Sequence, residues 1–154
     1  MLAALELPGY RVMRWERDGG AYRNPRDYPA TSLATTGTHD TESLAEWWEA
    51  ESDATRAAVA AAYPEFVTAQ PPDAAFTPRV HEALVTAALQ SSSALCVLPW
   101  QDVFGRRERV NLPGSMGDSN WSYRVEWNVE DLAQQPEAVS RATWLAHLAL
   151  AAGR

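Results

Sequence analysis

The sequence predicts an α/β fold in which parallel strands are connected by helices. Apolar runs typical of strands are followed along the chain by segments of helical periodicity. No hairpin signal such as Asn-Gly separates the expected strands, which favours crossover connections between parallel neighbours. The 154 residues, 46% of them hydrophobic, suit one domain whose core buries roughly two-thirds of the unfolded surface. A complete eight-stranded α/β barrel needs about 250 residues, so the chain is either a small open domain or a piece of something larger.

Three segments are expected to form strands. Residues 10–15 alternate between apolar and polar side chains after a Pro-Gly turn, and residues 31–36 form a second run that ends at a glycine. Residues 94–99 are continuously apolar, which predicts a strand buried on both faces. The polar residues 16–30 between the first two strands are expected to form an irregular loop.

Helical periodicity predicts the elements that follow the strands. It begins at Thr41, where Asp40 is a candidate N-cap, and it returns over residues 54–63. A Thr-Pro pair predicts the start of a helix over about 78–91, and a final amphipathic helix is expected over 136–150.

The segment between the last two of these helices is less regular. After the third strand we expect a long loop over 100–120. Residues 121–127 alternate between apolar and polar side chains, which fits either a strand or a segment at the edge of a loop. Asn128 can cap a short helix. Seven Trp and five Tyr are enough for an aromatic core or for a stacking surface. The tryptophans expected in the core because of their helical spacing are Trp47, Trp48 and Trp144.

Charge and cysteine content restrict the partners and the compartment. The net charge is −7 and every basic residue is Arg, so no basic stripe is available for phosphates. Nucleic acid and anionic membranes are therefore not expected as partners. Cys96 is the single cysteine, expected as a small buried thiol, and it cannot form an internal disulfide, which fits a reducing cytoplasm. Neither terminal apolar run has the pattern of a signal peptide or a membrane span.

Two polar clusters directly follow predicted strands, Thr-Gly-Thr-His-Asp at 36–40 and Pro-Trp-Gln-Asp at 99–102. In α/β folds ligand-facing side chains converge at such positions. In the alternative interpretation, the two aspartates only cap local backbone and His39 satisfies a loop carbonyl. A third cluster, residues 111–124, combines glycines, amides, Trp and Arg, which is typical of a binding loop for a hydroxyl-rich ring.

Other chemistries find little support in the sequence. His39, His81 and His147 are far apart without ligand spacing, so no metal site is expected. His81 and His147 lie in predicted helices and are expected at the surface or the edge of the core. The chain has no Gly-x-Ser-x-Gly elbow, phosphate loop or dinucleotide fingerprint.

Four ordered motifs resemble one known family. They are Leu-Pro-Gly-Tyr-Arg-Val at 7–12, Thr-Gly-Thr-His-Asp-Thr at 36–41, Leu-Pro-Trp-Gln-Asp-Val-Phe-Gly at 98–105, and Asn-Leu-Pro-Gly followed by Asn-Trp-Ser-Tyr-Arg within 111–124. Together they resemble the 4-α-glucanotransferases, also called amylomaltases or disproportionating enzymes, of glycoside hydrolase family 77. The resemblance implies a C-terminal fragment with about strands six to eight of a TIM (β/α)8 barrel. Residues 1–127 would form the partial barrel, and residues 128–154 a C-terminal helical segment of the same domain.

The resemblance also implies a chemistry. Such an enzyme moves α-1,4-glucan segments between maltodextrins by a retaining mechanism, without a metal or an organic cofactor. Of the three acids that the family uses, only the transition-state stabiliser has a counterpart here, Asp40, while the nucleophile and the acid/base are not in the chain. His39 is expected to contact the same sugar. The other residues expected to bind substrate or shape its site are Gln101, Asp102, Asn120, Trp121 and Arg124.

These expectations lead to two alternatives for function. In the first, the chain is part of a cytoplasmic 4-α-glucanotransferase whose ligand is maltodextrin, an α-1,4-glucan. Its partner would be the missing N-terminal part of the barrel. In the second, it is a non-catalytic maltodextrin-binding or interaction module. Binding of maltodextrin without turnover would favour the second alternative.

Overall fold

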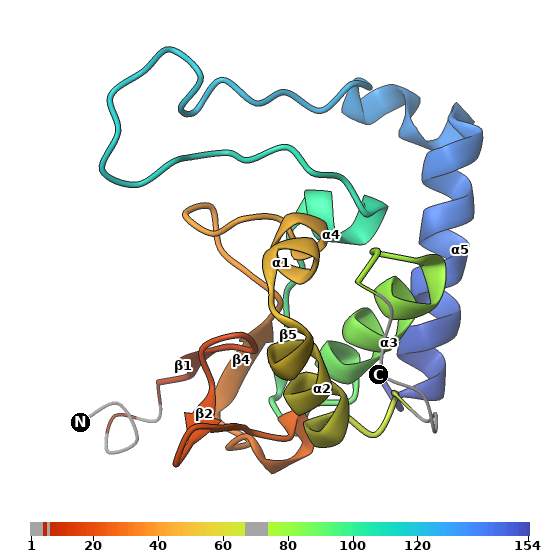
Figure 1. Cartoon of the computed structure of the whole chain (residues 1–154). Helices are drawn as coiled ribbons and strands as arrows, with labels where there is room; N and C mark the ends of the chain where they lie inside the picture. The colour runs from red at the N-terminus through yellow and green to blue at the C-terminus, as the bar shows by residue number, and fades with distance from the viewer. Residues whose placement is uncertain (1–4, 6, 67–73) are drawn as a thin grey trace.

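The computed structural model describes residues 5, 7–66 and 74–154. Its main sheet has three parallel strands in the order β1 (Gly9–Val12), β4 (Ser32–Thr35) and β5 (Leu95–Cys96) (Figure 1). The predicted parallel arrangement is confirmed, although each strand is shorter than the run that predicted it. Beyond β5, the amide of Val97 still donates to the carbonyl of Ala34 at 3.0 Å, before Pro99 caps the next helix.

The two faces of this sheet are unlike. Tyr10, Leu33 and Leu95 are aligned across the strands, so their side chains share one face, where Tyr10 is 67% and Leu95 50% exposed. One residue later, Ala34 points to the other face and is fully buried in the core. The prediction that residues 94–99 are buried on both faces is therefore wrong. Helices within the described ranges cover one face, and the other has no cover there.

The polar segment 16–30 is not the irregular loop that was expected. It contains an antiparallel hairpin of β2 (Arg17–Asp18) and β3 (Ala21–Tyr22). Gly19 and Gly20 form its turn with φ of +56° and +92°, a backbone conformation that side chains with a Cβ rarely adopt. Gly-Gly is itself a hairpin signal, like the Asn-Gly pair that the sequence lacks.

Helix α1 (Leu44–Ala50) starts later than predicted. Its N-cap is Ser43, whose hydroxyl accepts from the amide of Glu46 at 3.2 Å, while the Glu46 carboxylate accepts from the amide of Ser43 at 3.3 Å. This reciprocal capping box fixes the helix end. The predicted start at Thr41 is wrong, and so is the alternative in which Asp40 serves only as the helix cap.

The other helical elements are the 3-10 helices η2 (Pro25–Asp27) and η3 (Val129–Gln134) and the α-helices α2 (Asp53–Ala62), α3 (Pro78–Leu89), α4 (Trp100–Phe104) and α5 (Pro136–Ala151). The predictions of α2, α3 and α5 are confirmed. The predicted loop over 100–120 is corrected, because its first residues form α4. Residues 121–127 contain no strand. In Figure 1, α5 runs beside α3, and the chain between α4 and η3 forms a long arc.

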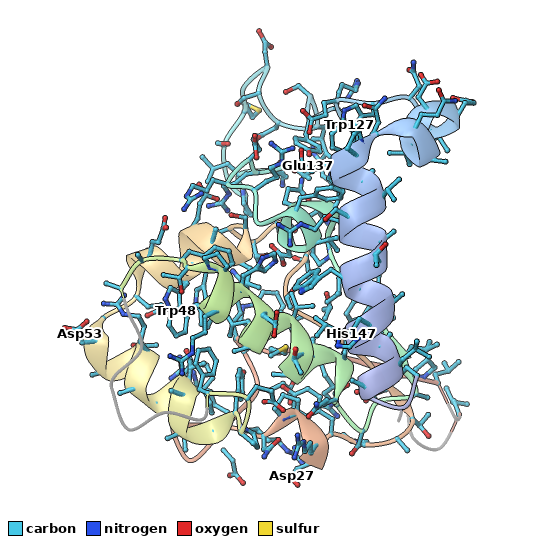
Figure 2. The ribbon with its side chains drawn as sticks, turned by 90° about the vertical axis from the view of Figure 1, so that its right-hand side faces the viewer. Asp27, Trp48, Asp53, Trp127, Glu137 and His147 are labelled. Atoms are coloured by element: carbon cyan, nitrogen blue, oxygen red, sulfur yellow. The ribbon has the colours of Figure 1, made fainter. Side chains whose placement is uncertain are left out.

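A single core joins the sheet, the hairpin and the helices. Trp48 is completely buried and stacks on Phe66 with ring centroids 5.4 Å apart, and in Figure 2 it lies on the side of α3 away from α5. Trp47 is also buried, and Trp144 packs against the cluster, so the expected core role of the three tryptophans is confirmed. No helix in residues 5, 7–66 or 74–154 combines the length and the apolar character needed to cross a membrane.

Candidate active site

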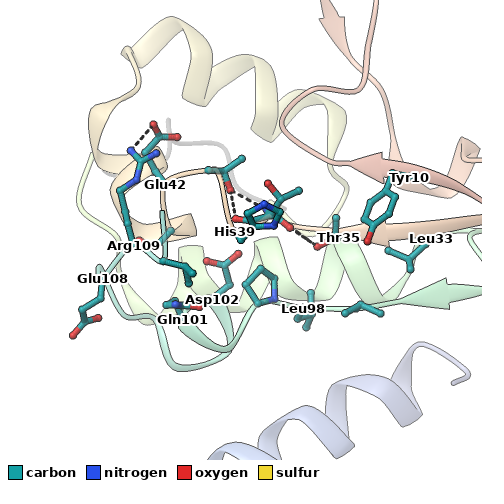
Figure 3. A pocket seen from close by; sticks show the side chains of 17 residues that line it. Tyr10, Leu33, Thr35, His39, Glu42, Leu98, Gln101, Asp102, Glu108 and Arg109 are labelled. Atoms are coloured by element: carbon teal, nitrogen blue, oxygen red, sulfur yellow. Dashed lines mark hydrogen bonds and ion pairs between the residues drawn. The ribbon is translucent and has the colours of Figure 1, made fainter. Parts of the chain in front are cut away.

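A cavity of about 300 Å³ lies on the uncovered face of the sheet, at the carboxyl ends of the strands (Figure 3). Its floor comes from the strands, and its walls come from the segments that follow β4 and β5 and from residues 108–110. The walls are mixed, with apolar side chains next to hydroxyl, carboxylate, amide and guanidinium groups. The residues that line it include Tyr10, Gly37, His39, Glu42, Gln101, Asp102 and Arg109.

The segment that joins β4 to α1 carries the two side chains with the clearest expected roles. His39 lines the cavity, and its Nε2 lies 3.3 Å from Oδ2 of Asp40 beside the wall. Both side chains are about half exposed, at 56% and 46%. The other carboxylate oxygen of Asp40 accepts from Nδ2 of Asn111 at 2.6 Å. Asp40 is therefore an oriented, solvent-accessible carboxylate next to the cavity.

The arc after α4 folds back onto this segment. Arg109 donates to Oε1 of Glu42 at 3.0 Å and to the carbonyl of Asp40 at 3.2 Å. The ring of Trp121 lies over His39, with centroids 5.0 Å apart. Trp121 has a φ of +62°, which is unusual for a bulky residue, and its amide donates to the carbonyl of Val110 at 2.8 Å. The loop thus holds an exposed aromatic ring beside the His39–Asp40 pair.

Asp102 is too deeply buried for its side chain to bind a ligand directly. It is 1% exposed, and its carboxylate accepts from the Thr36 hydroxyl at 2.5 Å and from the Leu44 amide at 2.6 Å. Burial raises the pKa of Asp102, against the opposing effects of these two hydrogen bonds and of the charge of Arg14. Gln101, also buried, lies next to it on the cavity wall.

The prediction that His81 lies at the surface or the edge of the core is wrong. His81 is 5% exposed, and its Nε2 donates to the carbonyl of Asp102 at 2.6 Å. Its ring packs between Phe76 and Trp144. Burial lowers the pKa of His81, although the bond to the Asp102 carbonyl opposes this shift. His147, by contrast, is exposed.

The remaining expected site residues lie outside the cavity wall. Asn120 shapes the loop, since Oδ1 accepts from the Leu112 amide at 2.9 Å and Nδ2 donates to the Ser115 carbonyl at 3.0 Å. Arg124 is exposed and donates to the carbonyls of Trp121 and Tyr123. Among the described residues, no group of three or more His, Cys, Asp and Glu side chains is placed to hold a metal ion.

Sequence reasoning missed two arginines at this site. Arg14 is buried, and it donates from Nε to the Thr36 carbonyl at 3.1 Å and from Nη1 to the Glu42 carbonyl at 3.0 Å. The signal for Arg14 was a charged side chain within an apolar run at the end of a strand. Arg109 offered no comparable signal, because it stands among other charged residues in a loop.

Comparison with known proteins assigns the chain to a family. The family model described as 4-alpha-glucanotransferase matches residues 1–130. A 4-alpha-glucanotransferase of Chlamydia trachomatis is 28% identical, over 86% of this chain and 27% of the relative. A chloroplastic or amyloplastic 4-alpha-glucanotransferase of Oryza sativa subsp. japonica is 27% identical, over 88% of this chain and 22% of the relative.

Solved structures agree on the fold. An amylomaltase from Streptococcus agalactiae, solved in complex with acarbose, matches with a TM-score of 0.74 and 23% identity, over 99% of this chain and 28% of that one. An amylomaltase from Corynebacterium glutamicum matches with a TM-score of 0.73 and 21% identity, over 96% of this chain and 26% of that one. The chain thus spans about a quarter of the length of the proteins it matches. With the family model matching most of its residues, the chain belongs to the 4-alpha-glucanotransferase family.

Proposed function

We propose that these 154 residues form the part of a 4-alpha-glucanotransferase that carries its third carboxylate, in a protein that transfers α-1,4-glucan segments between maltodextrins. In this proposal β1, β4 and β5 are about the sixth to eighth strands of a TIM barrel. Residues 1–127 belong to the barrel, and 128–154 are a helical segment of the same domain. The nucleophile and the acid/base come from residues outside these 154.

The cavity is the observation that carries the proposal. It lies at the carboxyl ends of parallel strands, where TIM-barrel enzymes bind their substrates. It also opens on the sheet face with the exposed Tyr10 and Leu95. In a closed barrel, side chains of the other strands fill the space over that face. An incomplete barrel therefore accounts for both the uncovered face and the position of the cavity.

The chemistry assigns Asp40 an electrostatic role. Retaining transfer at an acetal carbon needs one carboxylate to attack and a second, about 5 Å away, to protonate the leaving oxygen and later activate the acceptor. Asp40 cannot perform both steps. As a carboxylate held by Asn111 and by His39, it is suited to bind sugar hydroxyls and to stabilise the positive charge of an oxocarbenium-like transition state.

The other expected residues support this site in different ways. His39 contacts the same sugar, and the exposed ring of Trp121 beside it offers an apolar face for a pyranose. Gln101 reaches the sugar from the wall. Asn120 and Arg124 shape the loop that presents Trp121. This chemistry needs neither a metal nor an organic cofactor, and the single cysteine fits a cytoplasmic protein.

A non-catalytic maltodextrin-binding module is the second candidate. The observation in its favour is that the Trp121–His39–Asp40 surface is assembled within this chain alone. Such a module binds glucan without turning it over. It needs no residues from other strands.

Two measurements on the purified chain test the proposal. The first is an NMR titration with maltotriose, which is expected to shift the signals of His39, Asp40 and Trp121. The second is the release of glucose and longer dextrins from maltotriose, which is expected to be absent because two carboxylates are lacking. Turnover by the chain alone overturns the proposed division of the catalytic groups. An absence of binding removes both candidates.

A substitution tests the electrostatic role of Asp40. In a complete enzyme containing this segment, Asp40→Asn is expected to lower turnover about 10²-fold or more, the scale for one preorganised electrostatic contact, with a smaller change in affinity. Asp118→Asn is the control, since Asp118 is an exposed acid elsewhere in the arc. Near-normal turnover of Asp40→Asn contradicts the catalytic role of Asp40.

A further inference from the structure

The segment from Thr36 to Leu44 is held at both ends by two buried side chains of opposite charge, Arg14 and Asp102. We infer that this pair is a clamp whose function is to position His39 and Asp40 toward the glucan. The inference rests on the proposed function. It makes Arg14 and Asp102 positioning residues, which act through the segment and do not touch the sugar.

Asp102 joins the two ends of the segment through its carboxylate. Its Oδ2 accepts from the hydroxyl of Thr36 at 2.5 Å, at the end of β4, and its Oδ1 accepts from the amide of Leu44 at 2.6 Å, at the start of α1. The carbonyl of Asp102 in turn accepts from Nε2 of His81 at 2.6 Å, which ties the clamp to α3. Both carboxylate oxygens are therefore engaged within the protein, and with 1% exposure the side chain is not offered to a sugar.

Arg14 joins nearly the same two points through backbone carbonyls. Its Nε donates to the carbonyl of Thr36 at 3.1 Å, and its Nη1 donates to the carbonyl of Glu42 at 3.0 Å. The guanidinium lies over the ring of Trp47, with Cζ 5.0 Å from the centroid, which fixes its plane. A planar group with several donors can bridge two carbonyls, whereas an ammonium group acts as a single point.

Gly37 lies between the two clamping side chains. A Cβ added there would be 3.2 Å from Nη2 of Arg14 and 3.6 Å from Oδ2 of Asp102. It would also be 2.6 Å from Oγ1 of Thr41, closer than real Cβ contacts. Nη2 of Arg14 is itself buried without a hydrogen-bond partner in the structure. The space between the opposite charges is thus kept free of any side chain, so that both can reach the backbone of the segment.

The segment needs buried support because the contacts that hold its functional side chains, Asn111 with Asp40 and Trp121 with His39, lie near the surface. His39 and Asp40 are about half exposed, and they precede α1. A misplacement of about 1 Å in a positioning group can cost about 10²-fold in rate. Two buried anchors remove most of the freedom of a turn whose tip must stay open to the ligand.

The test compares variants of the whole chain by NMR and by maltotriose affinity. Asp102→Ala removes both acceptors, while Asp102→Asn keeps the shape and an acceptor for Leu44 and serves as the conservative rescue. Arg14→Lys keeps the charge but loses the two-point bridge. Leu84→Ala is the control for lost stability, because Leu84 is fully buried in α3 away from the cavity.

Asp102→Ala and Arg14→Lys are expected to shift the amide signals of residues 38–41, to alter the ring-current shift of His39 from Trp121, and to weaken maltotriose binding about tenfold or more. Asp102→Asn should restore most of the affinity. Leu84→Ala should leave those signals and the affinity unchanged. If Asp102→Ala does not fold, Asp102→Asn and Arg14→Lys still provide the comparison.

Two results overturn the inference. One is wild-type signals for 38–41 together with wild-type affinity in Asp102→Ala or, if that variant does not fold, in Arg14→Lys. The other is that Leu84→Ala reproduces the changes, which would make them a general loss of stability. A wild-type chain that does not bind maltotriose overturns the proposed function and the glucan role of the clamp, while the signals of 38–41 still decide whether Arg14 and Asp102 hold the segment.

Discussion

Because one face of the sheet is uncovered, truncation of a leucine on that face should cost little unfolding free energy. Leu95 in β5 is 50% exposed on that face, whereas Leu84 in α3 is fully buried. Full burial of a leucine side chain stabilises a protein by about 1.5–3 kcal/mol, so truncation of the half-exposed Leu95 should cost about 1 kcal/mol. Water fills the space that Leu95→Ala leaves, so no cavity cost is added. Leu84→Ala leaves a cavity and should cost about 2–5 kcal/mol.

Urea unfolding of both variants, followed by circular dichroism, measures the difference. The free energy of unfolding should fall by a clearly smaller amount for Leu95→Ala, with similar slopes of the transitions. Equal losses for the two variants would refute the reasoning. They would mean that the face carrying Leu95 is covered in the isolated chain, and the proposal of an incomplete barrel would lose its main support.

Three further predictions concern single residues. Burial raises the pKa of the Cys96 thiol to about 11, so at pH 8 it should react with a disulfide reagent about 100-fold more slowly than an ordinary thiol, and unfolding in urea should abolish the difference. Gly20→Ala should cost about 1–2 kcal/mol because φ is +92°, whereas Gly117→Ala, where φ is not positive, should not; equal unfolding midpoints contradict this. Burial lowers the pKa of His81, so its contribution to stability is complete above the unfolded pKa of about 6.5 and is lost as the pH falls below it. His81→Gln should flatten this dependence in urea titrations between about pH 5 and 8, and an unchanged slope would show that His81 does not cause it.

Much of the fold was predictable because it depends on local patterns. The Thr-Pro start of α3 and the amphipathic pattern of α5 depend on neighbouring residues only, and both helices are where the sequence indicates. The start of α1 was not predicted, because several possible caps precede it, Asp40 among them, and only the Ser43–Glu46 reciprocity selects one. The exposure of Leu95 could not be predicted, since an apolar run does not reveal which partners cover it.

The location of the candidate site was predictable from the sequence, but the contacts of its residues were not. Strand ends at 36 and 99 correctly indicated that His39, Gln101 and Asp102 meet at one cavity. The division between buried and accessible groups was not visible, because Asp40 and Asp102 have the same chemistry and differ only in tertiary environment. Arg14 acquires its role from two carbonyls that are distant in sequence.

The central position of β4 has a consequence for the order of assembly. Register pairs residue 10 with residue 33 and residue 33 with residue 95, so every strand contact of the main sheet involves β4. Closing the shorter of these two loops is favoured by about 0.9 kcal/mol of chain entropy. We therefore expect β1 and β4 to pair first and β5 to dock last. The Arg14 half of the clamp would then form early, and the chain would acquire Asp102, and with it the finished site, only in the final folding step.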